Sequence, residues 1–201
     1  MAENDMHKHK LYEESSIRRN VINVILKTLF EISEREMLHS ERVSEMCGEI
    51  AFHMNFDKNG ISKMKTAGLI HDIGKIGIEG NILNKISGLD LKEWQEMKKH
   101  PEIGWRILRS TTEFSELAQT ILEHHERWDG KGYPKGIKGD EISKEARIIK
   151  LADSYDAMTN NRSYRNSLGK DEAMAEITKC SGTQFDPEIA DVFIKKVLMK
   201  E

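Results

Sequence analysis

The sequence predicts an all-α protein that folds as a single-domain helical bundle, and three observations lead to this prediction. Apolar residues recur at the i, i+3, i+4, i+7 spacing of amphipathic helices, and no segment shows the sustained alternation of a half-buried strand. The chain has three prolines, and 32% of its residues are charged, which suits helices that each have one solvent-facing side. The length of 201 residues fits one domain.

The first helix is expected over residues 14–33, where Ile22, Ile25, Leu29 and Ile32 form an apolar stripe. It is either the first helix of the bundle or a helix that couples the domain to a neighbouring domain or to a second copy in a homodimer. The residues before it are polar. We therefore expect residues 1–13 to form a flexible tail and residues 14–201 to form the domain.

Five further apolar stripes predict the other helices. They run from Val43 to Ala51, Ile61 to Gly68, Leu117 to Leu122, Ile148 to Tyr155 and Ile189 to Val197. The longest loop is expected over residues 129–142, which hold four glycines and one proline. Ser181-Gly182-Thr183 should end one helix, and Asp186-Pro187 should begin the last one.

Charge and apolar content exclude several classes of protein. The net charge of -3 gives no basic footprint for DNA or RNA, whereas local cations still permit a small anionic ligand. No apolar run approaches the roughly 20 residues that span a bilayer, and residues 1–10 lack the apolar stretch of a signal peptide. Cys47 and Cys180 show no metal-ligand spacing and are expected to be reduced. These features indicate a cytoplasmic protein.

Histidines and aspartates end or interrupt the apolar stripes, and five of the eight histidines stand at such places. The candidate metal ligands are His39, His71, Asp72, His100, His124, His125 and Asp153. Buried imidazoles and carboxylates need partners, and a shared cluster of divalent metals would satisfy all of them. A single histidine beside an apolar face is usually a packed core residue. The pairs His71-Asp72 and His124-His125 are hard to explain by packing.

Asp72 suits a bridging position, because each oxygen of its carboxylate can bind one metal ion while the adjacent His71 binds one of the two. Two ions about 3.5–4 Å apart can clamp the attacking and leaving oxygens of a phosphoryl displacement. The pattern therefore favours metal-assisted phosphoryl chemistry.

Five segments, in this order, resemble the HD-GYP family within the HD superfamily of phosphohydrolases. They are His39 to Val43, His71-Asp72-Ile73-Gly74-Lys75, His100-Pro101-Glu102-Ile103-Gly104, His124 to Pro134, and Ala152 to Thr159 with Arg162, Tyr164 and Arg165 following. The resemblance runs from about residue 20 to the C-terminus. His71-Asp72 with Gly74-Lys75 alone would indicate only the superfamily. The HHExxDGxGYP pattern over residues 124–134 is the specific part.

The resemblance implies a metal centre, usually of iron or manganese, that hydrolyses cyclic di-GMP to linear pGpG, and in some members onward to GMP, in bacterial second-messenger signalling. It implies that His39, His71, Asp72 and Asp153 hold one ion, and that Asp72, His100, His124 and His125 hold the other. We expect two divalent ions, iron in first place, with manganese, nickel and zinc as alternatives.

The resemblance also implies catalytic and substrate-binding residues. Asp72 and Lys75 are the expected catalytic residues, with Lys75 at the scissile phosphate or assisting the leaving oxygen. The residues expected to bind substrate are Lys75, Tyr133, Asp156, Arg162 and Arg165. For the two arginines, the alternative is a solvated helix end.

Family members with three metals carry a glutamate four residues before the first histidine, and this chain has Arg35 there. Glu34 and Glu36 flank Arg35 and are expected to point elsewhere on the helix. A third metal is therefore not expected, and GMP should be a slow or absent product.

The Gly132-Tyr133-Pro134 segment has two interpretations. In the functional interpretation, Tyr133 and Pro134 shape the pocket or meet a partner such as a GGDEF domain. In the structural interpretation, the glycines of the loop turn the chain after the helix that carries His124 and His125. We expect both. Trp128 is expected either to stack on a guanine or to pack at the base of this loop.

Two other functions remain open on the sequence. One is hydrolysis of another cyclic dinucleotide, such as cyclic GMP-AMP, or of a mononucleotide. The other is a catalytically silent sensor or interaction module. Silent members usually lack metal ligands or the GYP motif, and this chain has both.

Overall fold

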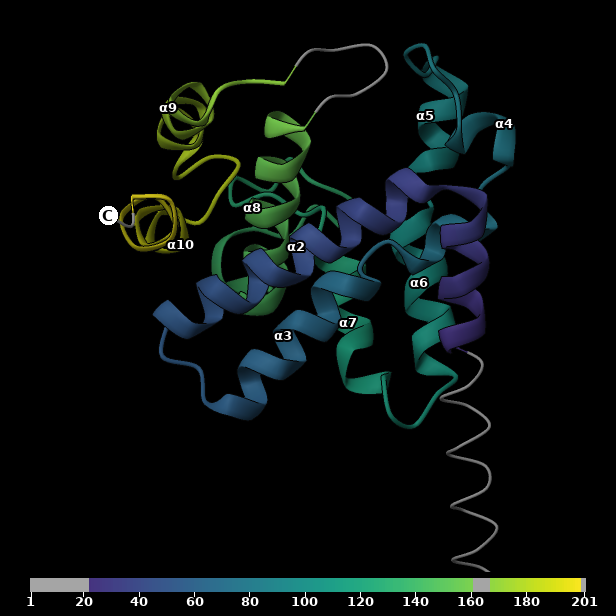
Figure 1. Cartoon of the computed structure of the whole chain (residues 1–201), viewed down its shortest axis with the longest axis horizontal. Coiled ribbons are helices and arrows are strands. Elements are labelled where there is room, and N and C mark those ends of the chain that lie inside the picture. The colour runs from purple at the N-terminus through teal and green to yellow at the C-terminus, as the bar shows by residue number, and fades with distance from the viewer. Residues whose placement is uncertain (1–21, 161–166, 200–201) are drawn as a thin grey trace, which may run out of the picture.

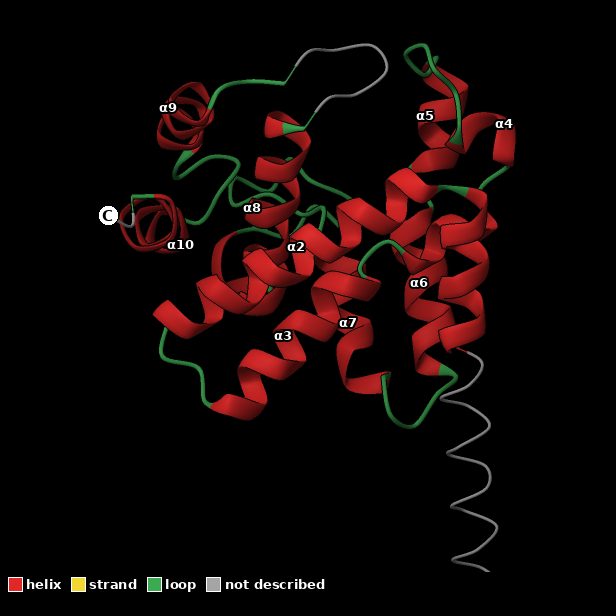
Figure 2. Ribbon diagram, viewed as in Figure 1, coloured by secondary structure: helices red, strands yellow, loops and turns green. Residues whose placement is uncertain are grey.

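The structure is a computed structural model that describes residues 22–160 and 167–199 (Figure 1). Within these ranges the secondary structure is helical and no strand is present (Figure 2), apart from one isolated bridge between Ser181 and Phe185. The all-α prediction is confirmed. None of the helices in these ranges is long and apolar enough to cross a membrane.

Most of the helices form the body of the bundle. They are α2 (Glu34–His53), α3 (Lys58–Ile70), α6 (His100–Arg109), α7 (Ala118–Glu123), α8 (Lys144–Thr159), α9 (Lys170–Cys180) and α10 (Pro187–Val192). Other helical segments connect and extend them. These are η1 (Ile73–Gly77), α4 (Gly80–Leu83), α5 (Leu91–Met97), η2 (Ser115–Leu117), η3 (Gly139–Glu141) and the π-helical η4 (Phe193–Leu198).

A helix over residues 22–32 precedes α2, and the chain leaves helical geometry at Ser33. Ile22, Leu26 and Leu29 of this helix are buried, and Ile22 and Leu26 belong to the main core cluster. The described part therefore packs as the first helix of the bundle would. The predicted start at residue 14 and the predicted tail over residues 1–13 lie outside the described residues.

Helices α2 and α3 form a hairpin at the centre of the bundle (Figure 1). Asp57 begins α3 by accepting a hydrogen bond from the backbone N–H of Gly60 at 2.7 Å, which satisfies a helix-terminal donor. A side chain at Gly68 would lie 2.9 Å from Cα of Ser44, so this glycine allows the close approach of the two helices. Their buried apolar faces pack against α8 around Ile148 and Leu151.

The predicted helix boundaries near the C-terminus are confirmed. Helix α9 ends at Cys180, and Gly182 follows with a φ of +77°, a conformation that favours glycine. Asp186 caps α10 by accepting from the N–H of Glu188 at 2.8 Å, and Pro187 takes the first helical position. The loop expected over residues 129–142 is also present, interrupted by the short η3.

Candidate metal centre

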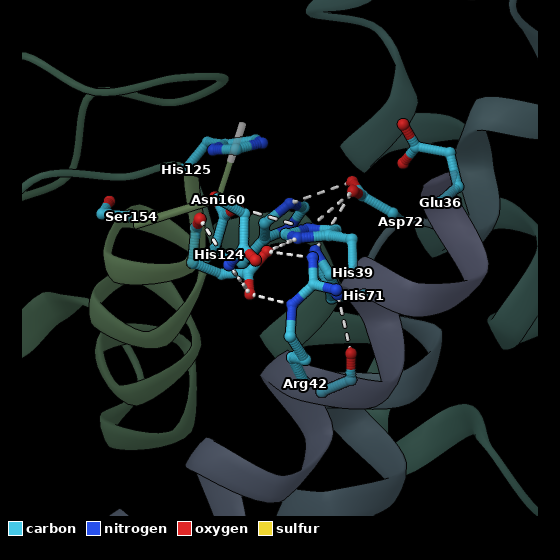
Figure 3. A network of polar contacts seen from close by, with 12 residues as sticks. Glu36, His39, Arg42, His71, Asp72, His124, His125, Ser154 and Asn160 are labelled. Carbon is cyan, nitrogen blue, oxygen red and sulfur yellow. Dashed lines mark hydrogen bonds and ion pairs between the residues drawn. The ribbon is translucent and has the colours of Figure 1, made fainter. Parts of the chain in front are cut away.

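Five helical elements bring the predicted metal ligands together. The Asp72 carboxylate, which follows α3, is the shared partner of the group, and the dashed lines in Figure 3 run from it to neighbouring histidines. Its Oδ1 is 3.1 Å from Nε2 of His100 and 3.9 Å from Nε2 of His124. Its Oδ2 is 3.1 Å from Nε2 of His71 and 3.7 Å from Nε2 of His39. Each oxygen thus faces a different pair of histidines.

The arrangement divides into two sets of candidate ligands that share Asp72. One set comprises His39, His71 and Asp72, and the other comprises Asp72, His100, His124 and His125; in each set the ligand atoms lie within 4.8 Å of one another. Asp153 adjoins the first set, because its Oδ1 is 3.5 Å from Nε2 of His39. All seven predicted ligands are therefore in one place.

Three of the histidines are aimed by the ends of helices. The last carbonyls of a helix have no partner within that helix, and an imidazole Nδ1–H can donate to one of them. In each case the acceptor lies three residues earlier in the chain. The three bonds join His71 to the carbonyl of Gly68 (2.7 Å), His100 to that of Met97 (2.8 Å) and His124 to that of Ile121 (2.6 Å). Nε2 of each ring is left to point into the centre.

The unpaired atoms at the centre fit a metal cluster. A neutral imidazole that donates through Nδ1 has an unprotonated Nε2, which is a hydrogen-bond acceptor and a metal ligand. Nε2 of His100 lies 3.3 Å from Nε2 of His124 and 3.1 Å from Nε2 of His125, although two acceptors cannot bond each other. Nε2 of His71 and Oδ1 of Asp72 are buried without a hydrogen bond. Divalent cations would satisfy all of these atoms.

The charges of the carboxylates also suit cations. Burial by itself would raise the pKa of Asp72, but the charges of His71 and Lys75 outweigh it and hold the pKa well below its usual range. Burial likewise opposes ionisation of Asp153, and its neighbours His39 and His71 reverse that effect and lower the pKa. Both side chains are therefore available as anionic ligands.

The histidines differ from one another in protonation. Burial, together with the neighbouring His100 and His71, lowers the pKa of His124 to about 3, and burial lowers the pKa of His125 as well. Burial would lower the pKa of His71 too, but the charges of Asp72 and Asp153 outweigh it and raise the value to about 9 in the metal-free centre. The raised pKa favours a proton on His71 at neutral pH, and a metal ion at Nε2 would have to compete with that proton.

Asp156 was expected at the substrate, and the structure places its buried carboxylate behind His39. It accepts a hydrogen bond from Nδ1 of His39 at 2.7 Å. It also accepts two from Arg42, at 2.5 and 3.0 Å, and one from Asn160 at 2.9 Å. These contacts make Asp156 a positioning residue for His39, whereas direct contact with a substrate stays a prediction.

The expectation that Glu36 points away from the centre is wrong. Glu36 is buried and accepts a hydrogen bond from Nζ of Lys75 at 2.7 Å and from Nη2 of Arg35 at 3.1 Å. Nζ of Lys75 is also 2.7 Å from Oδ2 of Asp72. The signal in the sequence was the spacing of three residues between Glu36 and His39, which puts both on one face of α2.

The GYP loop packs directly on the centre. The Tyr133 ring stacks on His125, with the ring centroids 4.8 Å apart, and the Tyr133 N–H donates to the His125 carbonyl at 3.3 Å. A side chain at Gly132 would overlap the backbone of Glu126 and Arg127, so only glycine permits this return of the chain. Both the turning role and the pocket-shaping role of the loop are therefore present.

Trp128 packs at the base of the loop, where the Arg147 guanidinium lies 5.3 Å from its ring centroid. Trp128 is absent from the described lining of the cavity, so the packing interpretation holds. Trp94, which the sequence analysis did not single out, does line the cavity and meets Tyr133 edge to face at 6.3 Å. Trp94 lies between the recognisable segments, so no motif predicted that its exposed ring lines the cavity.

A cavity of 530 Å³ opens over the cluster, and Asp72, Lys75, Tyr133, Asp153 and Asp156 are among the residues that line it. Three of the predicted substrate-binding residues, Lys75, Tyr133 and Asp156, therefore border one space. The other two, Arg162 and Arg165, lie outside the described residues.

The fold and the cluster define an all-α domain with a histidine–aspartate centre of metal-ligand type. The chain belongs to the HD domain family, whose model matches residues 20–189, and the resemblance noted in the sequence is confirmed.

Similar proteins carry related names. The chain is 42% identical over 174 residues to a cyclic di-GMP phosphodiesterase of Thermotoga maritima, which covers 85% of this chain and 47% of that protein. It is 39% identical over 150 residues to a 3'3'-cGAMP-specific phosphodiesterase of Vibrio cholerae, covering 75% and 33% of the two chains. The chain thus spans less than half the length of these relatives.

The fold has solved counterparts. The structure of a cyclic GMP-AMP-specific phosphodiesterase from V. cholerae matches with a TM-score of 0.65 at 21% identity, covering 92% of this chain and 48% of that chain. At this identity, the match shows that the two chains share a fold.

Proposed function

We propose that this chain is a metal-dependent phosphodiesterase that hydrolyses cyclic di-GMP. The observation that carries the proposal is the pair of ligand sets that share Asp72 and open onto a cavity beside Lys75. The name of the Thermotoga maritima relative supports the choice of substrate. The first experiment is hydrolysis of cyclic di-GMP by purified protein loaded with Fe²⁺ under anaerobic conditions, or with Mn²⁺. No hydrolysis by protein shown to contain metal would refute the proposal and favour a silent sensor.

Two divalent ions are proposed, iron in first place and manganese, nickel or zinc as alternatives. His39, His71, Asp72 and Asp153 would hold one, and Asp72, His100, His124 and His125 the other. When bound, such ions supply the Lewis acidity that polarises a phosphodiester and eases deprotonation of the attacking water.

Lys75 is proposed to place a fixed positive charge beside the scissile phosphate. Burial opposes a charged ammonium, but Asp72 and Glu36 outweigh that effect and raise the pKa of Lys75. A lysine with a raised pKa is a weak acid near neutral pH. The contacts therefore favour electrostatic stabilisation of the phosphate over proton donation to the leaving oxygen. Glu36 holds this ammonium in place.

Arg162 and Arg165 are proposed to bind the substrate phosphates, because a guanidinium can grip a phosphate with two hydrogen bonds. Changing both to alanine should raise the Michaelis constant for cyclic di-GMP while metal content stays at the wild-type value. Unchanged kinetics in the double variant would instead support the alternative interpretation, in which the two arginines belong to a solvated helix end and do not bind substrate.

The proposed main product is pGpG. The linear product carries an added terminal phosphate, and a second cut would benefit from further positive charge at the site. Glu36, a further buried carboxylate beside Lys75, is already paired with Lys75 and Arg35, so recruiting a third ion to it would require displacing two cations. A time course that resolves pGpG from GMP tests this. Rapid and complete conversion to GMP would contradict it.

Cyclic GMP-AMP is the second candidate substrate, and the name of the V. cholerae relative favours it. The metals and phosphates that dominate the recognisable motifs do not distinguish the bases. Parallel assays with cyclic di-GMP and 3'3'-cGAMP at equal concentration decide between them through the ratio of kcat/KM.

Four further expectations stay predictions. They are a GGDEF partner that meets the GYP loop, a homodimer, a cytoplasmic location and the domain boundary at residue 14.

A further inference from the structure

Among the residues that the structure describes, five lysine and arginine side chains line the cavity: Arg35, Arg42, Lys75, Lys85 and Lys150. Four of them already pair with carboxylates. The pairs are Arg35 with Glu36 (3.1 Å), Arg42 with Asp156 (2.5 Å), Lys75 with Glu36 (2.7 Å) and Lys85 with Glu93 (2.5 Å). Lys150 has neither an ion pair nor a hydrogen bond from its ammonium within residues 22–160 and 167–199, although Asp153 attracts it at longer range.

Lys150 is half-buried, and its ammonium has lost part of its contact with water. A charge that is partly removed from water costs free energy, and an ion pair or a hydrogen bond would restore part of it. Burial lowers the pKa of Lys150, which reflects that cost. The Lys150 ammonium lines the cavity without a protein partner among the described residues, so it is available to bind an anionic group of a ligand.

Lys150 and Lys75 serve different parts of the cavity. Lys75 belongs to η1 and contacts Asp72 and Glu36. Lys150 belongs to α8, one turn before Asp153, and its charge acts on His125. The two ammonium groups come from separate elements and have separate neighbours, so they suit two separate anionic groups.

We propose that Lys150 binds the second, non-scissile phosphodiester of a cyclic dinucleotide. The inference rests on the proposed function. A cyclic dinucleotide has two phosphodiesters in one ring, so a contact to the second phosphodiester orients the first one over the metals. A charge-assisted hydrogen bond from an ammonium to a phosphate is among the stronger polar contacts available. Lys150 therefore selects cyclic dinucleotides over ligands with a single phosphodiester.

The test compares two substrates in four variants of the metal-loaded protein. Lys150→Met and Lys150→Gln remove the charge, Lys150→Arg keeps it, and Lys144→Met removes a cation on the same helix that is not part of the cavity lining. The substrates are cyclic di-GMP and bis(p-nitrophenyl) phosphate, which has one phosphodiester. Metal content and melting temperature are measured for each variant.

We expect the two neutral variants to raise KM for cyclic di-GMP by about tenfold or more, the effect typical of a hydrogen bond to a charged group. Their kcat/KM for bis(p-nitrophenyl) phosphate and their metal content should match wild type. Lys150→Arg should keep most of the affinity, and Lys144→Met should behave as wild type.

Three results would overturn the inference. Equal losses on both substrates, or loss of metal, would place Lys150 at the metal centre. Unchanged kinetics for cyclic di-GMP in folded neutral variants would give it no role in binding. Finally, the wild-type protein could cleave bis(p-nitrophenyl) phosphate but neither bind nor cleave a cyclic dinucleotide. That result would refute the proposed function and, with it, this inference.

Discussion

Asp72 is the residue on which the centre depends. Its two oxygens face two different pairs of histidines, and no other described residue belongs to both candidate ligand sets. Its low pKa keeps it anionic, so it can hold two cations close together despite their mutual repulsion.

We predict that Asp72→Ala lowers the content of both metals, whereas His100→Ala chiefly lowers one. The reason is that Asp72 is shared and His100 belongs to one set. Metal analysis of proteins purified in parallel measures this directly. Full metal content in Asp72→Ala would show that Asp72 does not bridge the ions.

Asp156 belongs to neither candidate ligand set, and it acts on the centre through its hydrogen bond with His39. We predict that Asp156→Asn weakens metal binding by about 10–100-fold, as is typical when the outer partner of a metal-binding histidine is lost. The amide removes the negative charge that pairs with Arg42 and holds the Nδ1–H tautomer of His39. Titration with Mn²⁺ checks the affinity. A raised KM for cyclic di-GMP at unchanged metal affinity would instead support the direct substrate contact predicted from the sequence.

At the scale of elements, the glycines of the motifs set how closely the segments approach. Gly74 in η1 faces α6, where a Cβ would overlap the His100 carbonyl and lie 2.5 Å from the backbone nitrogen of Gly104. The contact joins the segment that carries Asp72 to the helix that begins at His100. The distance between two predicted metal ligands thus depends on a missing side chain.

We predict that Gly74→Ala destabilises the protein by about 1–3 kcal/mol or more, the range for overpacking a rigid contact, and lowers metal content as well. Gly80→Ala is the matched control, because a Cβ there meets nothing within 4 Å. Chemical denaturation measures both. A Gly74→Ala protein as stable as the control would mean that η1 and α6 adjust without cost.

For the whole molecule, the centre ties together helices that are distant in the sequence. Candidate ligands come from α2, from the ends of α3 and α7, from the start of α6 and from α8. Metal that binds the folded state and not the unfolded chain must stabilise the fold. We predict that chelation lowers the melting temperature, and that a metal concentration of about 100 times Kd restores about 2.7 kcal/mol. Equal melting curves with and without chelator would contradict the assignment of these residues as ligands.

Metal binding should also depend on pH through His71. Its pKa of about 9 in the metal-free centre means that Nε2 carries a proton at neutral pH, and this proton must leave when a cation binds. Apparent Mn²⁺ affinity should therefore rise by about tenfold per pH unit for one released proton, and level off above pH 9. Titrations at pH 6.5, 7.5 and 8.5 measure the slope. Affinity that does not change with pH would show that His71 is not a ligand.

Much of the fold and the centre could be predicted from local patterns. Helical periodicity identified the first helix and α2, α3, α7, α8 and α10, whereas no apolar stripe marked α4, α5, α6 or α9. The cap at Asp186-Pro187 located the start of α10, because this signal depends on neighbouring residues. The paired His71-Asp72 and His124-His125 identified candidate ligands that the structure brings together, because packing alone rarely places two such groups together at the end of an apolar stripe.

Contacts between distant elements were decided by the tertiary structure alone. Glu36 pairs with Lys75 across 39 residues, and Asp156 supports His39 across 117. Nothing near Lys150 in the sequence indicates that its ammonium lacks a partner. The sequence by itself determined which side chains have the chemistry of a metal centre. Which of them bind, which position others and which stay unpaired depends on the packing of separate helices, because burial and distance set the energy of a charge.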